Sequence, residues 1–329
     1  TDLRQSWRVS RGRIVALVSV LLVLSLVVGL IVKLRINNTN EVDRQAALQP
    51  FYTPPAQITG APGTIIRQEP LGITVPGATA LRILYVTQGY RLVALDAKTG
   101  ELVHSFGSNG VVDLKEQDDQ PMDLVTGEVG LHSAPIISKD VIVIGAAHRE
   151  GGAPKSKTNV KGYIRGFDVR TGKRKWIFHT IPKPGEFGLD TWLNDSWSYT
   201  GNTGAWGEIS IDEPAGVAYV GVEAPTGDFY GGPRPGNNLF GESLVALDLE
   251  TGQRKWHYQF VHHGIWDHDN PSPPILGDVQ IKGKRIPVVA QPSKQAFLYV
   301  LNRETGEPVW PIVERPVEKG SVPGEYYAP

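Results

Sequence analysis

Apolar residues along this chain follow two patterns that predict different kinds of structure. One apolar run extends from Ile14 to Val32 and is broken only by two serines and a glycine. A run of this length can cross a bilayer as a helix. Beyond residue 81, apolar residues instead form short β-rich runs such as LRILYV, VIVIGAA, VAYVGV and FLYVLN, separated by Gly, Pro and Asn turns. We therefore predict an N-terminal transmembrane helix followed by an all-β body.

Basic residues on either side of this run predict its orientation. The segment before it contains Arg4, Arg8, Arg11 and Arg13, whereas Lys33 and Arg35 follow it. Because the larger basic cluster is expected to stay cytoplasmic, residues 1–35 are predicted to form a single-pass anchor in the inner membrane, with the body facing the periplasm. A cleaved signal peptide is the alternative, but the run exceeds a usual signal-peptide core and no small-x-small site follows in LRINNTNEVDRQ.

Residues 36–81 are predicted to be a linker of uncertain origin. The segment is largely polar at its start and contains the pair Pro54-Pro55, which suits a spacer between a membrane and a folded domain. The stretch FYTPPAQITGAPGTIIRQEPLGITVPGATALRILY (51–85) resembles the mature N-terminus of secreted lipase-like α/β-hydrolases. That resemblance implies that residues 1–81, including the anchor, come from another gene.

Charge and cysteine content exclude several classes of function. The net charge is -1, and no basic run occurs beyond the first 35 residues, so an electrostatic footprint for nucleic acid is missing. The chain has no cysteine, which excludes thiol catalysis, thiolate metal sites and disulfides. The haem-attachment motif C-x-x-C-H is likewise absent from this sequence.

A repeated motif, A/G-x-D-x-x-T-G-x-x-x-W, organises the body. Its four copies are ALDAKTGELVHSF (94–106), GFDVRTGKRKWIF (166–178), ALDLETGQRKWHY (246–258) and VLNRETGEPVWPI (300–312). The Asp can accept hydrogen bonds from turn amides, and the TG pair supplies the positive-φ position of a hairpin. Trp176, Trp256 and Trp310 occupy the last position, which His104 takes in the first copy. A large flat side chain recurring once per repeat suits the wedge between adjacent propeller blades.

These repeats resemble the tryptophan-docking motifs of the eight-bladed quinoprotein alcohol and glucose dehydrogenases. The segments LYVTQGYRLVALDAKTG, NDSWSYTGNTGAWG, PTGDFYGG and VHHGIWDHDNP are also similar to segments of that family and occur in its order. The resemblance implies a partial PQQ-binding β-propeller over residues 82–329. Since a blade needs roughly 60 residues, about four of the eight blades fit there. The chain begins with Thr and stops at GEYYAP, where relatives would run on, so we expect a fragment.

The resemblance also implies a chemistry and the residues that perform it. Family members oxidise an alcohol or aldose hydroxyl by hydride transfer to pyrroloquinoline quinone (PQQ), with a carboxylate as general base and Ca²⁺ polarising the quinone carbonyl. Asp267, in HHGIWD, matches the family's base; a turn-capping Asp is the alternative. Lys294, in AQPSKQAFLYVLNR, matches the cation beside the quinone oxygens; a surface lysine is the alternative. Trp206, in NTGAWGEISIDE, matches the aromatic floor under the cofactor; core packing is the alternative.

Further candidate ligands lie on strand-end loops. Glu150 in GAAHREGG and Glu223 in GVEAPTGD match positions near the family's calcium ligands, and solvated glutamates are the alternative. Ser133 and His148 are candidates for contacting the PQQ carboxylates, with a structural role as the alternative, while Asp269 is either a supporting or a surface carboxylate. A hydrolytic metal site built from His262, His263, Asp267 and Asp269 ranks low, because adjacent residues on a strand point to opposite faces.

Three functional hypotheses follow. The first is a membrane-bound dehydrogenase that uses PQQ and Ca²⁺ to oxidise an aldose such as glucose, another polyol or an alcohol, and that passes electrons to a membrane quinone. The second is a non-catalytic propeller scaffold, similar to outer-membrane assembly factors, which needs the docking motifs but not Asp267, Lys294 and Trp206 together. The third is an inactive fragment that lacks the rest of the ring.

Overall fold

The computed structural model describes residues 81–148, 156–315 and 318–328. The predicted membrane helix, the linker and most of the segment 51–85 lie outside the described residues. Within the described ranges, no helix is long and apolar enough to cross a membrane. These ranges contain sixteen strands and only two short 3-10 helices, so the prediction of an all-β body is confirmed for this part of the chain.

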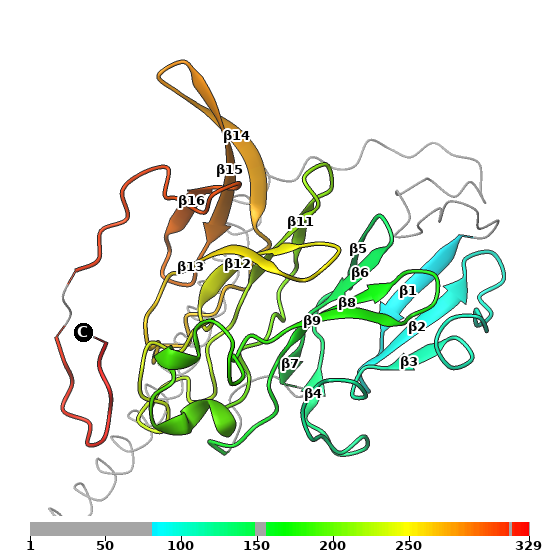
Figure 1. Ribbon diagram of the computed structural model, residues 1–329, viewed down its shortest axis with the longest axis horizontal. Coiled ribbons are helices and arrows are strands. Elements are labelled where there is room, and N and C mark those ends of the chain that lie inside the picture. Colours follow the sequence, from blue (N-terminus) through cyan, green and yellow to red (C-terminus); the bar gives the residue numbers. More distant parts are fainter. Residues whose placement is uncertain (1–80, 149–155, 316–317, 329) are drawn as a thin grey trace, which may run out of the picture. The chain divides into compact units, whose positions relative to one another are not determined.

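In the described ranges, four antiparallel sheets of three or four strands follow one another along the chain (Figure 1). The first contains β1 (Arg82–Val86), β2 (Arg91–Asp96) and β3 (Val111–Asp113), and the second contains β5 (Ile136–Ser138), β6 (Val141–Ile144), β8 (Ile164–Asp168) and β9 (Arg174–Phe178). The third contains β10 (Ser210–Asp212), β11 (Val217–Gly221), β12 (Ser243–Asp248) and β13 (Arg254–Gln259), and the fourth contains β14 (Ile275–Ile281), β15 (Lys284–Pro292) and β16 (Leu298–Asn302). The connections hold a small ladder of β4 (Val129–Gly130) with β7 (Ala147–His148), and the helices η1 (Leu189–Thr191) and η2 (Leu193–Ser198).

Alternating side chains of the inner strands fill separate cores between neighbouring sheets. In β6, Val141 and Val143 pack into the core shared with the third sheet, whereas Ile142 and Ile144 pack into the core shared with the first. Side chains of β12 likewise alternate between the core shared with the second sheet and the core shared with the fourth. Successive side chains of a strand point to opposite faces, so a strand between two other sheets must be apolar at every position. The continuous apolar runs of the sequence therefore reflect sheets packed face to face, as in propeller blades.

The repeated Asp-x-x-Thr-Gly segments form the predicted turns. In the second sheet, Oδ1 of Asp168 accepts hydrogen bonds from the backbone N–H groups of Arg170 and Thr171, at 3.1 and 2.8 Å. Gly172 follows with a φ of 71°, a left-handed conformation that glycine adopts without strain. The other three copies bond their turns in the same way, through Asp96, Asp248 and Asn302.

Each buried motif tryptophan docks on the turn of the next sheet. The indole N–H of Trp176 donates to the Leu249 carbonyl at 2.9 Å, and its ring lies so close to Gly252 that a Cβ there would be 2.5 Å from Cδ2. Trp256 makes the equivalent hydrogen bond to the Arg303 carbonyl at 3.0 Å and packs on Gly306. The tryptophan therefore joins consecutive blades, and the turn glycine is required by its close approach as well as by its φ.

The first repeat differs from its sequence-based alignment. His104, which occupies the tryptophan position, is exposed. Phe106 is fully buried instead, and a Cβ at Gly172 would lie 3.0 Å from its ring. The chain is fixed there by a hydrogen bond from the Gly107 N–H to the Thr171 carbonyl at 2.9 Å. The aromatic group that docks on the second sheet is thus Phe106, two residues beyond the expected position, because an apolar ring rather than an imidazole fills this dry wedge.

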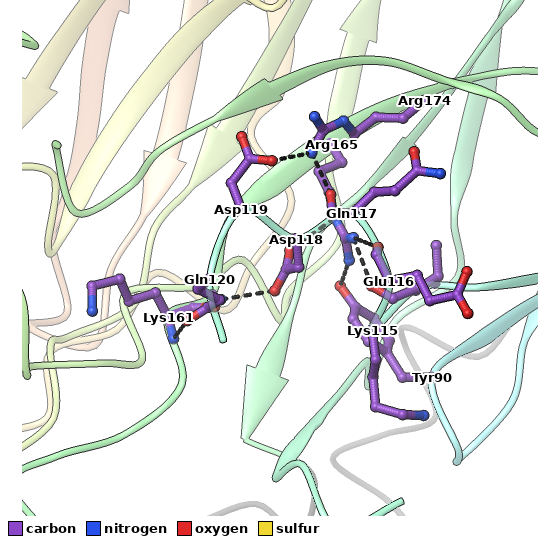
Figure 2. Close-up of polar contacts among 12 residues, drawn as sticks. Tyr90, Lys115, Glu116, Gln117, Asp118, Asp119, Gln120, Lys161, Arg165 and Arg174 are labelled. Atoms are coloured by element: carbon purple, nitrogen blue, oxygen red, sulfur yellow. Dashed lines mark hydrogen bonds and ion pairs between the residues drawn. The ribbon is translucent and has the colours of Figure 1, made fainter. Parts of the chain in front are cut away.

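A buried arginine fixes the segment 114–120 that follows β3 (Figure 2). Arg165 of β8 donates to the Leu114 carbonyl at 2.6 Å and to the Tyr90 hydroxyl at 3.0 Å, and its Nε lies 3.2 Å from Oδ1 of Asp118. Gln120 donates to the other Asp118 oxygen at 2.7 Å. Burial raises the pKa of Asp118 to about 6, although the Arg165 guanidinium opposes the shift. This network holds a long connection to the second sheet.

Candidate active site

Side chains from several connections surround a cavity of about 250 Å³. Glu223 follows the end of β11, Asp267 and Asp269 follow β13, and Lys294 follows β15. Rigid strands thus fix the starting points of the loops that carry the polar groups. The cavity is lined by His132, Ala147, His148, Asn202, Trp206, Glu223, Ala224, Asp228, Asp267, Asp269 and Lys294.

Lys294 joins two carboxylates of this cavity. Its ammonium Nζ lies 3.0 Å from Oδ2 of Asp267 and 3.0 Å from Oδ2 of Asp269. Burial lowers the pKa of Lys294, but the attraction and hydrogen bonds of Asp269 and Asp267 outweigh this effect and raise it overall. The lysine is therefore a partly exposed cation that lines the cavity and is paired with two of its carboxylates.

Asp269 connects three walls of the cavity. Its Oδ1 accepts the Ala224 N–H at 2.7 Å, and its Oδ2 accepts from the indole N–H of Trp206 at 3.2 Å and from the Lys294 ammonium at 3.0 Å. The residue is 8% exposed, so it is not a surface carboxylate. Burial raises the pKa of Asp269, and the neighbouring Asp267 adds to the increase, although Ala224 and Lys294 oppose it.

Trp206 lies beside the cation. The Lys294 ammonium is 5.9 Å from the centre of the Trp206 ring, a distance at which a cation is attracted to an aromatic face. The ring is half-buried and lines the cavity, in contrast to the docked motif tryptophans. Ser133 is not among the lining residues, but its hydroxyl donates to the carbonyl of Gly207 at 3.1 Å and so lies next to Trp206 in the fold.

Two further acids bring the number of carboxyl groups that line the cavity to four. Glu223 is buried and its Oε1 accepts the Gly204 N–H at 2.8 Å; burial, with the nearby Asp269 charge, raises its pKa well above the usual value. Burial also raises the pKa of Asp228 to about 6, and the charges of Asp267 and Asp269 contribute. Among the described lining residues, these four carboxylates face one ammonium. Carboxyl groups gathered in this way favour either a proton or a bound cation.

The remaining candidate ligands are placed only in part. His148 lines the cavity from β7, and its Nε2 lies 3.5 Å from Oε2 of Glu128. Glu150 lies outside the described residues. Within the described ranges, no group of three or more His, Cys, Asp or Glu side chains is arranged to hold a metal ion.

The two adjacent histidines have different partners. His262 lies 3.0 Å from Oε1 of Glu314, whereas His263 is buried with Nδ1 2.9 Å from the Gly236 carbonyl and Nε2 3.0 Å from Oε1 of Glu325. Both residues lie in a turn after β13, so the expectation that they belong to a strand was wrong. The two rings nevertheless make separate contacts, and neither ring lines the cavity.

Asn202 and Asp228 are lining residues that were not singled out from the sequence. They lie in the segments NDSWSYTGNTGAWG and PTGDFYGG, whose resemblance to the quinoprotein family was noted as a whole. The N–H of Asp267 donates to the Asp228 carbonyl at 3.3 Å, which places the two acids on adjoining backbones. Their position in family-like loops that follow strands was the available signal.

Comparison with known proteins shows the family to which the chain belongs. Residues 64–329 match the family profile of the PQQ-linked glucose/ethanol/alcohol dehydrogenase β-propeller domain. The chain is 34% identical over 250 residues to quinoprotein glucose dehydrogenase of Escherichia coli, which covers 75% of this chain and 30% of that protein. It is 33% identical over 282 residues to quinoprotein glucose dehydrogenase of Gluconobacter oxydans, covering 85% of this chain and 33% of the relative.

Solved structures show the same similarity. The quinohemoprotein alcohol dehydrogenase ADHIIG of Pseudomonas putida superposes with a TM-score of 0.56 and 28% identity, over 70% of this chain and 32% of that chain. A europium-containing methanol dehydrogenase superposes with a TM-score of 0.57 and 26% identity, over 70% of this chain and 39% of that chain. The chain thus spans about a third of the length of the curated relatives it matches.

Proposed function

Because this chain belongs to the PQQ-dependent glucose/ethanol/alcohol dehydrogenase family, we propose that it forms part of an oxidoreductase acting on an aldose, such as glucose, or an alcohol. The observation that carries the proposal is the pair of contacts from Lys294 to Asp267 and Asp269 inside a cavity also lined by Trp206. Titratable groups whose pKa values are shifted by burial and by each other, and which share one cavity, are typical of catalytic sites.

Asp267 is the proposed general base. Its carboxylate lines the cavity and is half-exposed, so a substrate hydroxyl can reach it. As the alcohol is oxidised to a carbonyl, its hydroxyl proton passes to the Asp267 carboxylate and a hydride leaves the carbon. When bound, PQQ supplies the two-electron acceptor for that hydride. The proposed electron acceptor for the reduced enzyme is a membrane quinone.

Lys294 and Trp206 are the proposed cofactor contacts. A protonated lysine held by two carboxylates supplies a fixed positive charge for oxygens that become negative during the reaction. The half-buried Trp206 ring offers a flat face on which a tricyclic quinone can stack. Its N–H bond to Asp269 fixes the orientation of the ring. Ser133 and His148 remain proposed contacts of the PQQ carboxylates.

We propose that the cavity binds a hard divalent cation. Four carboxylates face one lysine among the described lining residues, and burial, with the neighbouring carboxylates, raises the pKa values of Glu223 and Asp228. Oxygen donors of this kind fit Ca²⁺. We propose Glu223 as a ligand, with Asp269 adjoining it, and Glu150 as a further ligand on its sequence position. The ion would lower the pKa values of these acids and polarise a quinone oxygen.

The proposed substrate is an aldose or another small hydroxyl compound. Two of the most similar relatives are named quinoprotein glucose dehydrogenases, and a largely polar cavity suits a sugar ring with several hydroxyls. We further propose an inner-membrane protein whose propeller faces the periplasm, anchored through residues 14–32; this rests on the hydropathy and charge pattern alone.

A non-catalytic scaffold is the alternative, and the buried charges argue against it. A scaffold needs the docked tryptophans and turns, which depend on none of the cavity residues. Clustering Glu223, Asp228, Asp267 and Asp269 disfavours folding, because Glu223 and Asp269 lose solvation on burial and the four carboxylates repel one another. Such a cluster is expected where a site needs it.

The proposal is tested with the full-length protein that contains this chain, reconstituted with PQQ and Ca²⁺. We expect PQQ-dependent reduction of a dye acceptor by aldoses or alcohols, and comparing glucose, other aldoses and simple alcohols assigns the substrate class. PQQ binding without turnover on any of these compounds would favour the scaffold or an inactive protein. Failure to bind PQQ would overturn the proposal.

A further inference from the structure

Arg234 is a buried cation that no step of the proposed reaction uses. Its side chain is 1% exposed, and its guanidinium donates to three backbone carbonyls and one side-chain amide. Nε reaches the Thr226 carbonyl at 3.0 Å, and Nη2 reaches the carbonyls of Gly227 and Gly264 at 2.9 and 2.6 Å. Nη1 donates to Oδ1 of Asn238 at 2.8 Å. Arg234 therefore joins the segments 223–228 and 264–269.

These two segments carry all four acids that line the cavity among the described residues. Thr226 and Gly227 directly precede Asp228, and Gly264 lies three residues before Asp267. The segments also touch through the bond from the Asp267 N–H to the Asp228 carbonyl at 3.3 Å. The guanidinium thus fixes the base of each acidic loop while its own atoms stay outside the cavity.

Glu242 also contacts both segments. It is 1% exposed, and one carboxylate oxygen accepts the His268 N–H at 3.2 Å, between the two site aspartates. Its own N–H donates to the Glu223 carbonyl at 3.3 Å. A Cβ at Gly264 would overlap the Glu242 carboxyl group, so this glycine is required by a close approach. Burial raises the pKa of Glu242 to about 8, although the Arg234 charge opposes the shift.

We propose that Arg234 and Glu242 are positioning residues, which together hold the segments 223–228 and 264–269 at the spacing that brings Asp267, Asp269 and Lys294 into contact. We call this pair the Arg234–Glu242 brace. Its role in catalysis rests on the proposed function. Its role in holding the two segments does not, because the brace consists of contacts within this chain. Buried arginine suits the role, since its planar fork satisfies several carbonyls at once with little loss of freedom per bond.

The chain offers a matched control in Arg165. Both arginines are fully buried and donate to backbone carbonyls, but Arg165 holds the segment 114–120 (Figure 2), and neither it nor Asp118 lines the cavity. Arg234→Lys and Arg165→Lys each replace a fork by a single ammonium. General loss of stability therefore affects both variants, whereas loss of the brace affects only the first.

The first measurement is hydrogen exchange of peptides followed by mass spectrometry, without cofactor. In Arg234→Lys, we expect peptides covering 223–228 and 263–269 to exchange at least about tenfold faster than in wild type, because their carbonyl contacts are lost. In Arg165→Lys, the increase should be confined to 114–120 and its neighbours. Unchanged exchange at 263–269 in Arg234→Lys, or an equal increase across all four sheets, would overturn the brace.

The second measurement links the brace to the site. We expect Arg234→Lys to weaken PQQ binding about tenfold, because Asp269 orients both Lys294 and Trp206. Binding is measured through the quenching of tryptophan fluorescence by PQQ. We expect kcat to fall by about 10- to 100-fold, since small displacements of a catalytic group are costly. Arg165→Lys should change neither by more than about threefold. Failure of wild-type protein to bind PQQ would count against the proposed function, and the exchange data would still decide on the brace.

A second set of variants covers the case in which Arg234→Lys does not fold. Gly264→Ala introduces a methyl group against Glu242, and Glu242→Ala removes the obstructing carboxyl group. If Gly264 and Glu242 hold each other in place, the losses in kcat of the two single variants should not multiply. The double variant should then be at least about tenfold more active than the product of the two single losses predicts. Independent, multiplying losses would contradict the brace.

Discussion

The Lys294 ammonium lies 3.0 Å from a carboxylate oxygen of Asp267, although the two residues follow strands of different sheets. Replacing this lysine tests whether it is a functional cation. We expect Lys294→Ala to lower kcat by about 10²- to 10³-fold, because the site loses the charge that stabilises negative oxygens. Steady-state dye reduction measures the change.

Lys284→Ala is the control for that variant, because Lys284 is exposed at the start of β15. It should retain wild-type turnover. Lys294→Arg keeps the charge and should be impaired much less than Lys294→Ala. Equal activity of Lys294→Ala and wild type would contradict the role assigned to the lysine.

Docking of Trp176 predicts different costs for two glycine substitutions. Gly252 and Gly283 both have positive φ, at 69° and 77°. A Cβ at Gly252 would meet the Trp176 ring at 2.5 Å, whereas nothing lies within 4 Å of one at Gly283. We expect Gly283→Ala to reduce the free energy of unfolding by about 1 kcal/mol through backbone strain. Gly252→Ala should cost about 1–3 kcal/mol more, because the indole must move.

Denaturant unfolding of the two glycine variants measures this difference. Similar costs for both substitutions would show that the tryptophan does not constrain the turn. A larger cost for Gly283→Ala would contradict the docking arrangement altogether.

Asp118 predicts a pH dependence of stability. Its pKa is about 6 in the folded protein, against a reference value of 3.8. Between these pH values the folded state keeps a proton that the unfolded state releases, so this residue makes the free energy of unfolding fall as pH rises. The contribution is at most about 3 kcal/mol. We therefore expect wild type to lose stability relative to Asp118→Asn between about pH 4 and 7.

Unfolding of wild type and Asp118→Asn at a series of pH values gives that comparison directly. Below about pH 4 Asp118 is protonated in wild type as well, so Asp118→Asn replaces one neutral side chain beside Arg165 with another, and only their different hydrogen bonds set the baseline difference in stability. The prediction therefore concerns the slope of the difference and not its sign. A difference that is constant across the window would contradict the raised pKa.

Glu223 predicts the response to calcium. If its carboxyl group is a ligand, Glu223→Gln should weaken Ca²⁺ binding at least about tenfold, because the ligand charge is lost. When a chelator lowers the free Ca²⁺ concentration, the variant should lose activity at concentrations that still sustain activity of wild type. Glu304→Gln, an exposed glutamate of the last docking turn, is the control. Equal calcium titrations for wild type and Glu223→Gln would exclude Glu223 as a ligand.

Repetition made the fold predictable from sequence. Asp168, Gly172 and Trp176 occupy motif positions that recur at fixed spacing. The turn and docking contacts of these residues recur at the matching positions of other repeats. His104 was misjudged because alignment by position does not reveal which ring is buried. The next aromatic residue, Phe106, fills the wedge instead. The turn that contains His262 and His263 was also not predicted, since its β-like composition does not disclose where β13 ends.

The candidate site was predictable only where a residue matches a family segment. Trp206, Asp267 and Lys294 were found in that way, and they do line one cavity. The supporting role of Asp269 depends on contacts between connections far apart in sequence. No sequence pattern indicated the role of Arg234. Its guanidinium bonds mainly to backbone carbonyls, which every residue has, so its partners cannot be recognised from their side-chain types. Such contacts follow from the folded backbone and not from a local pattern.

The most direct test of the proposed dehydrogenase is a single turnover with Asp267→Asn. Protein reconstituted with PQQ and Ca²⁺ is mixed rapidly with substrate, and reduction of the bound quinone is followed by its absorbance. Asparagine keeps the shape of the side chain but cannot accept the hydroxyl proton, so we expect the reduction rate to fall by about 10²- to 10⁴-fold while PQQ affinity changes by less than about threefold. Quinone reduction at the wild-type rate in Asp267→Asn would contradict the account.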